Sequence, residues 1–235
     1  MTPAVLEING VSKDYRALRP LRLQQLSVSA SESVAIVGLD LAAAEVLVNL
    51  VTGAVLPDAG ELRVFGRATS AIADADEWLA IVDRFGIVSE RAVLLEGLTV
   101  IQNLAMPFTL DIEPPPDDVR ARAAALAREV GLDGGAVERR VAELDSAGKL
   151  RVRLGRALAL GPSLLLLEHA SAALSDADAA SAGRQIRSVA ARRGTGILAA
   201  TADERFARAV ADRVLLFEAS TGRLRERGFR KWFRG

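Results

Sequence analysis

Apolar residues in this chain change their spacing along its length, and each spacing predicts a type of element. Alternation over residues 5–8 and 26–30 predicts two strands that pair, and the continuous apolar run 34–37 predicts a strand buried on both faces. Helical spacing follows over 42–52 and ends at Gly53. The first part of the chain is therefore expected to combine strands with a helix.

The middle of the chain turns from strand-like to helical spacing. A turn at 57–60 leads into a predicted strand over 61–66, and a short strand is predicted over 86–88. Helical spacing then covers residues 99–108, 117–130 and 149–160, with a Pro triplet at 114–116 between the first two segments. We therefore expect a mostly helical insertion between the strand at 86–88 and the strands that follow.

Strands and helices alternate in the last part of the chain. The predicted strands cover 164–167, 196–199 and 213–217, and the predicted helices cover 176–193 and 204–211. Alternation of this kind predicts βαβ units on a parallel sheet.

Composition narrows the classes of function. The 235 residues are 50% apolar, enough for a substantial core, and the formal net charge of +0 argues against a nucleic-acid partner bound through a basic body. The chain has no Cys, which excludes disulfides and thiolate metal sites. No leader-like start and no apolar run near the roughly 18 residues of a membrane span is present, so we expect a soluble, cytoplasmic protein.

Basic residues concentrate in a C-terminal tail, residues 222–235. Phe229, Trp232 and Phe233 lie between them. Two interpretations stay open: an amphipathic helix that binds a membrane surface or a partner, and a solvated terminus.

The segment 34–53 has the outline of a strand, a phosphate-binding turn and a helix. The P-loop pattern G-x-x-x-x-G-K-[ST] would place Gly, Lys and Ser or Thr where this chain has Ala43, Ala44 and Glu45. With the helical insertion and the segment 164–174, the chain nevertheless resembles the nucleotide-binding subunit of ABC transporters nearly from end to end.

The resemblance implies a P-loop NTPase-like ABC cassette, an α/β fold with a mostly parallel sheet, an N-terminal antiparallel β part and an inserted helical subdomain. The expected domain is single, residues 1–235. Its RecA-like core would cover about 1–88 and 162–220, and its helical subdomain about 89–161, before the tail 222–235.

The resemblance also assigns a vestigial nucleotide site. In the Walker A loop Gly38 remains and Asp40 lies in the same turn, while Ala44 replaces the phosphate-binding Lys and Glu45 the hydroxyl ligand of Mg²⁺. We interpret Glu45 as a solvated residue on an ordinary helix. Tyr15 matches the aromatic residue that stacks on adenine, although an exposed Tyr beside a turn explains it equally well.

Other family positions are altered as well. Glu168 holds the place of the Walker B Asp, and His169 that of the general base, for which we favour a structural role. In the signature, Asp145, a helix N-cap by its residue type, replaces Ser, and Ser146 and Gly148 follow it.

The positions that couple hydrolysis to movement are changed too. Glu90 replaces the Q-loop Gln, Ala202 the switch His, and Ser175 the D-loop Asp. Together with the Walker and signature changes they predict a pseudo-ATPase, with ATP and Mg²⁺ bound weakly or not at all and no metal site.

The resulting hypothesis is a catalytically degenerate cassette, structural or regulatory, on the cytoplasmic face of the inner membrane. It would dock on permease subunits through the region around Glu90 and Leu98–Phe108 and pair with a second cassette in a homo- or heterodimer. The stretch 98–108 resembles the T-V-x-x-N-V-x-x-P-L stretch of bacterial transporters that handle lipids or lipoproteins. Two alternatives stay open: a slow or asymmetric ATPase subunit, and a protein-binding scaffold unrelated to transport.

Overall fold

A computed structural model describes residues 3–226, and its first layer is an antiparallel sheet. The sheet has the order β2-β1-β4-β5, with bounds Ala4–Lys13 for β1, Leu21–Ser29 for β2, Ala59–Val64 for β4 and Arg67–Ala68 for β5. β1 pairs with β2 and with β4 in antiparallel register. The predicted pairing of the first two strands is confirmed.

The second sheet runs through the centre of the molecule in the order β10-β9-β3-β8-β7-β6. Its strands are Ser33–Val37 (β3), Phe85–Ser89 (β6), Leu164–Glu168 (β7), Gly196–Thr201 (β8), Arg213–Glu218 (β9) and Arg223–Glu226 (β10). Neighbouring strands from β9 to β6 are parallel, and only β10 pairs in the opposite direction. The predicted parallel sheet is confirmed.

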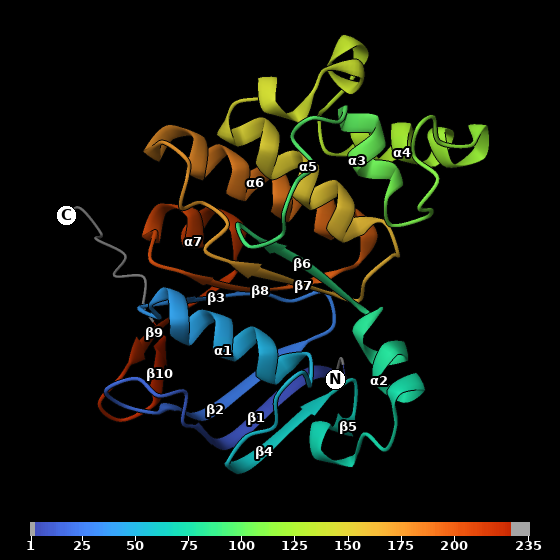
Figure 1. The fold of residues 1–235 in the computed structure, drawn as a ribbon. Coiled ribbons are helices and arrows are strands. Elements are labelled where there is room, and N and C mark those ends of the chain that lie inside the picture. The colour runs from blue at the N-terminus through green and yellow to red at the C-terminus, as the bar shows by residue number, and fades with distance from the viewer. Residues whose placement is uncertain (1–2, 227–235) are drawn as a thin grey trace, which may run out of the picture.

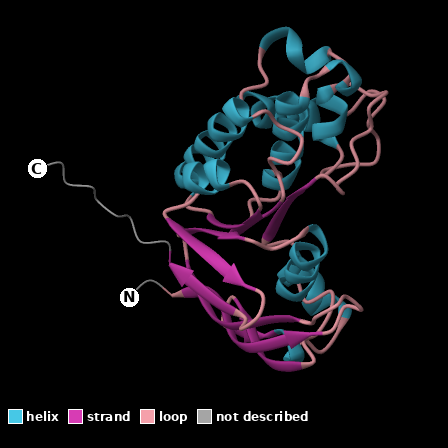
Figure 2. Cartoon of the chain, turned by 90° about the vertical axis from the view of Figure 1, so that its left-hand side faces the viewer, coloured by secondary structure: helices cyan, strands magenta, loops and turns pink. Residues whose placement is uncertain are grey.

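Helices cover both faces of the central sheet (Figure 1). Helix α1 (Leu41–Val51) lies between the two sheets, and α2 (Ala75–Val82) lies beside them. On the opposite face lie α3 (Val100–Ala105), α4 (Asp117–Glu129), α5 (Ser146–Leu158), α6 (Asp176–Arg193) and α7 (Glu204–Val210). Figure 2 shows most of the helices gathered on that one side of the strands.

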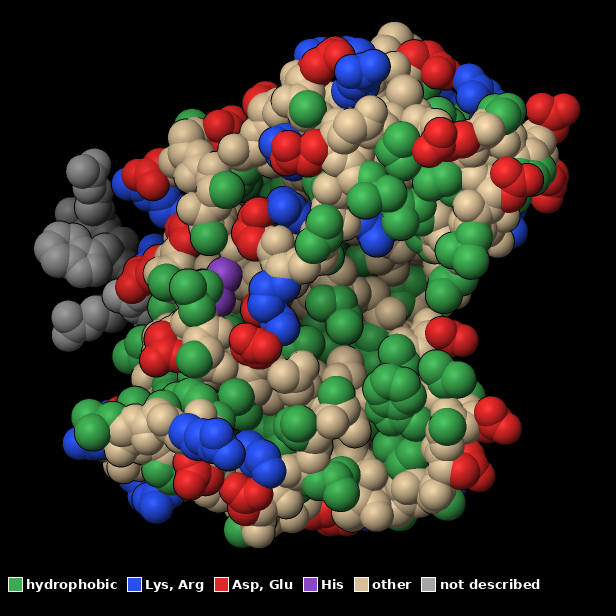
Figure 3. Space-filling model, viewed as in Figure 1, with side chains coloured by type: hydrophobic (Ala, Val, Ile, Leu, Met, Phe, Trp, Pro, Cys, Tyr) green, Lys and Arg blue, Asp and Glu red, His purple; other side chains and the backbone are tan. Residues whose placement is uncertain are grey.

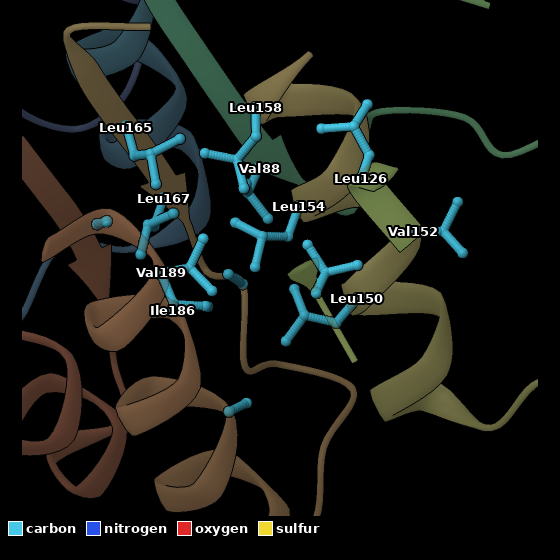
Figure 4. Packing of buried hydrophobic residues seen from close by; sticks show 14 of the residues in the cluster. Val88, Leu126, Leu150, Val152, Leu154, Leu158, Leu165, Leu167, Ile186 and Val189 are labelled. Atoms are coloured by element: carbon cyan, nitrogen blue, oxygen red, sulfur yellow. The ribbon is translucent and has the colours of Figure 1, made fainter. Parts of the chain in front are cut away.

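Alternation along the buried strands divides the hydrophobic core into two parts. Leu164 and Leu166 of β7 face the core between the two sheets, which also contains Leu47 of α1. Leu165 and Leu167 face the core beneath the helices. In Figure 4 the latter two point toward the side chains of α5 and α6. The continuous apolar run therefore serves two cores at once, because successive side chains of a strand point to opposite faces.

Helix α2 and strand β10 are among the short elements that were not predicted from the sequence. Helix α2 begins after the N-cap Asp74 and is fixed by tertiary contact, since Trp78 Nε1 donates to the carbonyl of Thr52 at 3.1 Å. Strand β10 takes up residues 223–226 of the tail, so an amphipathic helix over the whole tail is wrong for this part. The remainder of the predicted tail, with Phe229, Trp232 and Phe233, lies outside the described residues.

None of the helices within residues 3–226 is long and apolar enough to cross a membrane.

Close packing of β6 against α5 provides a test of the fold. A methyl group at Gly86 would lie 2.4 Å from the carbonyl oxygen of Ala157 and 2.7 Å from Cδ2 of Leu165. We expect Gly86→Ala to lower the free energy of unfolding by about 1–3 kcal/mol, the usual cost of overpacking. Gly97→Ala is the matched control, because a methyl group there meets no described atom within 4 Å. Urea denaturation of both variants measures the difference, and equal midpoints would contradict this packing.

An ion pair between helices gives the stability a defined pH dependence. Both oxygens of Glu129 in α4 accept hydrogen bonds from Arg193 in α6, at 2.7 and 2.6 Å, and the guanidinium lowers the pKa of that carboxyl. The stabilisation is complete above the pKa of an unfolded Glu, about 4.3. It is lost as the pH falls through the lowered pKa of the folded state. Glu129→Gln should therefore flatten the decline of stability in this acidic range, as measured by denaturation at a series of pH values; an unchanged slope would show that the pair contributes nothing.

Candidate functional site

The carboxyl ends of the parallel strands bring the predicted site residues to one edge of the sheet. Val37 lies opposite Thr201, and Glu168 lies between Ser89 and Ala200 in the register of β6, β7 and β8. The residues that follow these strands are Gly38, Glu90, His169 and Ala202. Loops at this edge are where open α/β sheets bind ligands.

The turn between β3 and α1 is short and is closed by its own carboxylate. Gly38 has a φ of 103°, a left-handed conformation that glycine adopts without strain. Asp40 is the N-cap of α1, and its Oδ1 accepts from the backbone N of Ala43 at 2.7 Å. Residues 41–43 belong to the helix, and the Ala44 side chain is fully buried. The positive end of α1 therefore already faces an anion from the same chain.

An arginine that sequence analysis did not single out bridges two of the predicted positions. Arg91 donates from Nε and Nη2 to the two oxygens of Glu168, at 2.8 and 2.6 Å. Its Nη1 donates to Oε1 of Glu45 at 2.7 Å. Glu45, expected as a solvated residue on a helix, is 44% exposed and in addition pairs with this guanidinium. Figure 3 shows acidic and basic side chains adjoining one another in the hollowed middle of this face.

His169 is buried, and one nitrogen of its ring lacks a hydrogen bond. Among the described residues, its Nε2 has no hydrogen-bond partner, and its φ of 44° is unusual for a residue with a side chain. Its backbone N donates to the carbonyl of Ala200 at 2.8 Å. A general base needs a group that orients its ring, and no such group is present among those residues.

The segment that follows β6 is also held from α5. Arg153 Nη1 donates to Oε1 of Glu90 at 2.8 Å and its Nε to the carbonyl of Ala92 at 3.3 Å, while Arg156 Nη1 donates to the carbonyl of Val93 at 2.7 Å. Burial, and then the neighbouring Arg153, lower the pKa of Arg156. At the switch position, Ala202 is exposed.

Tyr15 lies near the turn of α1, as a stacking residue would. It lines a cavity of about 100 Å³ together with Gly38, Asp40 and Ala43. Burial, and then the Asp40 carboxylate, raise the pKa of the Tyr15 hydroxyl. Pockets that enclose small ligands measure roughly 300–1,000 Å³, so this cavity is smaller than such pockets.

The residues in the signature position form the start of α5. Asp145 is its N-cap, as its residue type predicted, and Oδ1 accepts from the backbone N of Gly148 at 2.7 Å. Ser146 is exposed in the first turn. Within residues 3–226 no hydrogen bond or ion pair joins this turn to Asp40, Glu45 or Glu168.

A larger groove lies between β6 and the ends of α3 and α5. Its volume is about 380 Å³, and apolar side chains and two arginines line it: Phe85, Ile87, Met106, Pro107, Arg153 and Leu160 are among its residues. Figure 3 shows this face hollowed between the helices above and the sheets below. Of the predicted docking stretch 98–108, Met106 and Pro107 line the groove, whereas Val100 and Leu104 are buried in the core.

One signal in the sequence could have identified Arg91. The resemblance assigns two carboxylates, Glu45 and Glu168, to one site, and neighbouring carboxylates need a cation. Arg91 directly follows the Q-loop position at the end of β6, so a basic side chain there can reach both.

Comparison with known proteins identifies the family. The family model described as ABC transporter matches residues 21–172. The chain is 30% identical over 214 residues to the methionine import ATP-binding protein MetN of Brucella abortus, covering 91% of this chain and 57% of that protein. It is 34% identical over 203 residues to MetN of Caulobacter vibrioides, covering 86% and 60%. The chain thus spans less than two thirds of the length of these curated relatives.

Solved structures share the fold. CbiO1 from Clostridium perfringens, part of the ABC transporter complex cbiONQ, superimposes with a TM-score of 0.79 at 18% identity and covers 94% of this chain and 87% of its own. The ATP-binding cassette MJ0796, as a dimer in a post-hydrolysis state bound to ADP and Pi, gives a TM-score of 0.75 at 22% identity, covering 95% and 100%. With its sheet order, its match to the family model and its relatives in agreement, this chain belongs to the ABC transporter family as an ATP-binding cassette.

Proposed function

We propose that the chain is a cassette subunit of an ABC transporter that docks on permease subunits at the cytoplasmic face of a membrane and does not hydrolyse ATP. It would pair with a second cassette, either its own copy or a different chain. Its role would be to position the permease and the partner cassette, with any ATP hydrolysis left to that partner.

The observation that carries this proposal is the anion already present at the N-terminus of α1. The Asp40 carboxylate accepts the Ala43 N–H at the place where a P-loop presents its N–H groups to phosphate. A phosphate there would face a like charge. Ala44 adds a buried methyl group where the family has Lys. Each lost charge-assisted hydrogen bond is worth about 1.5–3 kcal/mol.

The side chains at the Walker positions are not arranged as ligands for Mg²⁺ either. Both oxygens of Glu168 accept from Arg91, and a guanidinium has no lone pair to offer a metal. No group of three or more His, Cys, Asp or Glu side chains within the described chain could hold a metal ion. We therefore propose no role for Mg²⁺ in this subunit.

The comparisons favour a second candidate function, an ATP-hydrolysing subunit of an importer. The curated relatives are named as ATP-binding proteins for methionine import, and the MJ0796 cassette was solved in a post-hydrolysis state. These names favour import over the trafficking of lipids or lipoproteins. Under this candidate, Tyr15 would bind adenine, and Asp40 and Arg91 would have to move away from the phosphates and the metal.

Docking on a permease is supported by the groove beside β6. Ile87 and Leu160 flank it with exposed fractions of 37% and 56%, and Arg153 and Arg156 add positive charge at its base. A helix with apolar residues and a carboxylate would complement this surface. Arg153, which lines the groove, also forms an ion pair with Glu90.

A nucleotide titration separates the two candidate functions. We expect the full chain to bind Mg·ATP with a Kd no tighter than about 1 mM, because losing the Lys alone weakens binding roughly tenfold to hundredfold. Isothermal titration calorimetry measures the affinity, and Tyr15→Ala is the control. Binding in the micromolar range that weakens in Tyr15→Ala, together with phosphate release, would establish the second candidate and refute ours.

Docking is tested by placing a charge on the rim of the groove. Leu160→Glu should abolish co-purification with a polytopic membrane protein from native membranes while the melting temperature stays within about 2 °C of the wild type. Leu110→Glu is the matched control, because Leu110 is 96% exposed and lies outside the groove. Recovery of the wild-type chain without any polytopic partner would contradict a role in transport.

A further inference from the structure

We propose that Arg91 is a built-in cation that takes the place of a metal ion between α1 and β7 and fixes the segment after β6 in a conformation that needs no ligand. This inference deepens the proposed function. Its test uses neither nucleotide nor a membrane protein, so its failure is separate from failure of the titration or of the docking experiment.

The geometry of the guanidinium carries the argument. The guanidinium binds two different elements. Nε and Nη2 donate to the two oxygens of Glu168 at the end of β7. Nη1 donates to Oε1 of Glu45 in the second turn of α1. The contacts to Glu168 form a bidentate fork, which fixes the direction of the side chain as well as its charge.

Burial explains why a cation is required at this place. The Glu168 side chain is only 5% exposed, whereas Arg91 and Glu45 are 47% and 44% exposed. A nearly buried carboxylate without a partner is strongly unfavourable, and a second carboxylate nearby adds repulsion. The hydrogen bond to Glu168 raises the pKa of the Arg91 guanidinium, so it stays charged.

The segment that carries Arg91 is tied on its other side to α5. Glu90, Ala92 and Val93 all accept hydrogen bonds from Arg153 or Arg156. Ion pairs of Arg91 therefore join this segment to α1 and β7, and one ion pair and two hydrogen bonds to backbone carbonyls join it to α5. The position of α5 relative to the central sheet is held by side chains of the chain itself.

The test is the response of thermal unfolding to Mg²⁺. Wild-type protein should melt at the same temperature in EDTA and in millimolar MgCl₂. Arg91→Ala should melt about 4–10 °C lower in EDTA, because Glu168 loses its partner. It should regain several degrees in MgCl₂, because two vacated carboxylates offer the oxygen ligands that Mg²⁺ prefers.

Three control variants define the result. Arg91→Ala combined with Glu45→Gln should lose the gain from Mg²⁺, because one carboxylate is removed. Arg91→Lys keeps a positive charge and should not respond to Mg²⁺. Arg205→Ala breaks an exposed ion pair with Asp176 elsewhere and should melt like the wild type in both buffers. Stabilisation of the wild type by Mg²⁺, or an Arg91→Ala variant that Mg²⁺ does not restore, would overturn the proposal.

Hydrogen exchange of the wild type keeps the test independent of whether Arg91→Ala folds. The amides of Arg91 and Ala92, which donate to Ser89, should exchange at equal rates in EDTA and in MgCl₂. Faster exchange in EDTA than in MgCl₂ would show that a metal, and not Arg91, holds the segment, and would overturn the proposal.

Discussion

Strands β3, β7 and β8 are covered on both faces, and every other feature of the molecule depends on this two-sided burial. Alternate side chains of β7 enter separate cores, one between the sheets and one beneath the helices. A strand buried in this way has one register and one direction. The ends of the parallel strands consequently lie at one edge, and the side chains that follow them meet there. The packing of the core therefore determines where the residues of the candidate site lie.

The hydrophobic pattern predicted the long elements well because their periodicity reflects this core. Helix 176–193 and strand 164–167 were predicted within one residue of their observed bounds. Helix α2 was missed, since it is only 8 residues long and is fixed by Trp78 contacting Thr52, which is distant in sequence. Strand β10 was missed because its residues are mostly charged and pair with β9 at the edge of the sheet.

The site was predictable only in part, for a related reason. Positions such as Gly38, Glu168 and His169 follow from a collinear resemblance, and the cap Asp145 follows from residue type at a helix start. The bridge from Arg91 to Glu45 and Glu168 joins residues 46 and 77 positions apart. No local pattern contains such a contact. Glu45 therefore looked like a solvated residue until the fold brought a guanidinium to it.

Asp40 and Arg91 balance two charges that the fold places at the edge of the central sheet. The N-terminus of α1 carries partial positive charge, and the buried Glu168 carries a full negative charge, so each needs an opposite charge in any folded state. Here a carboxylate and a guanidinium of the chain supply these charges. Loss of either side chain would leave one of these charges without a partner, so both help to keep the edge of the sheet folded.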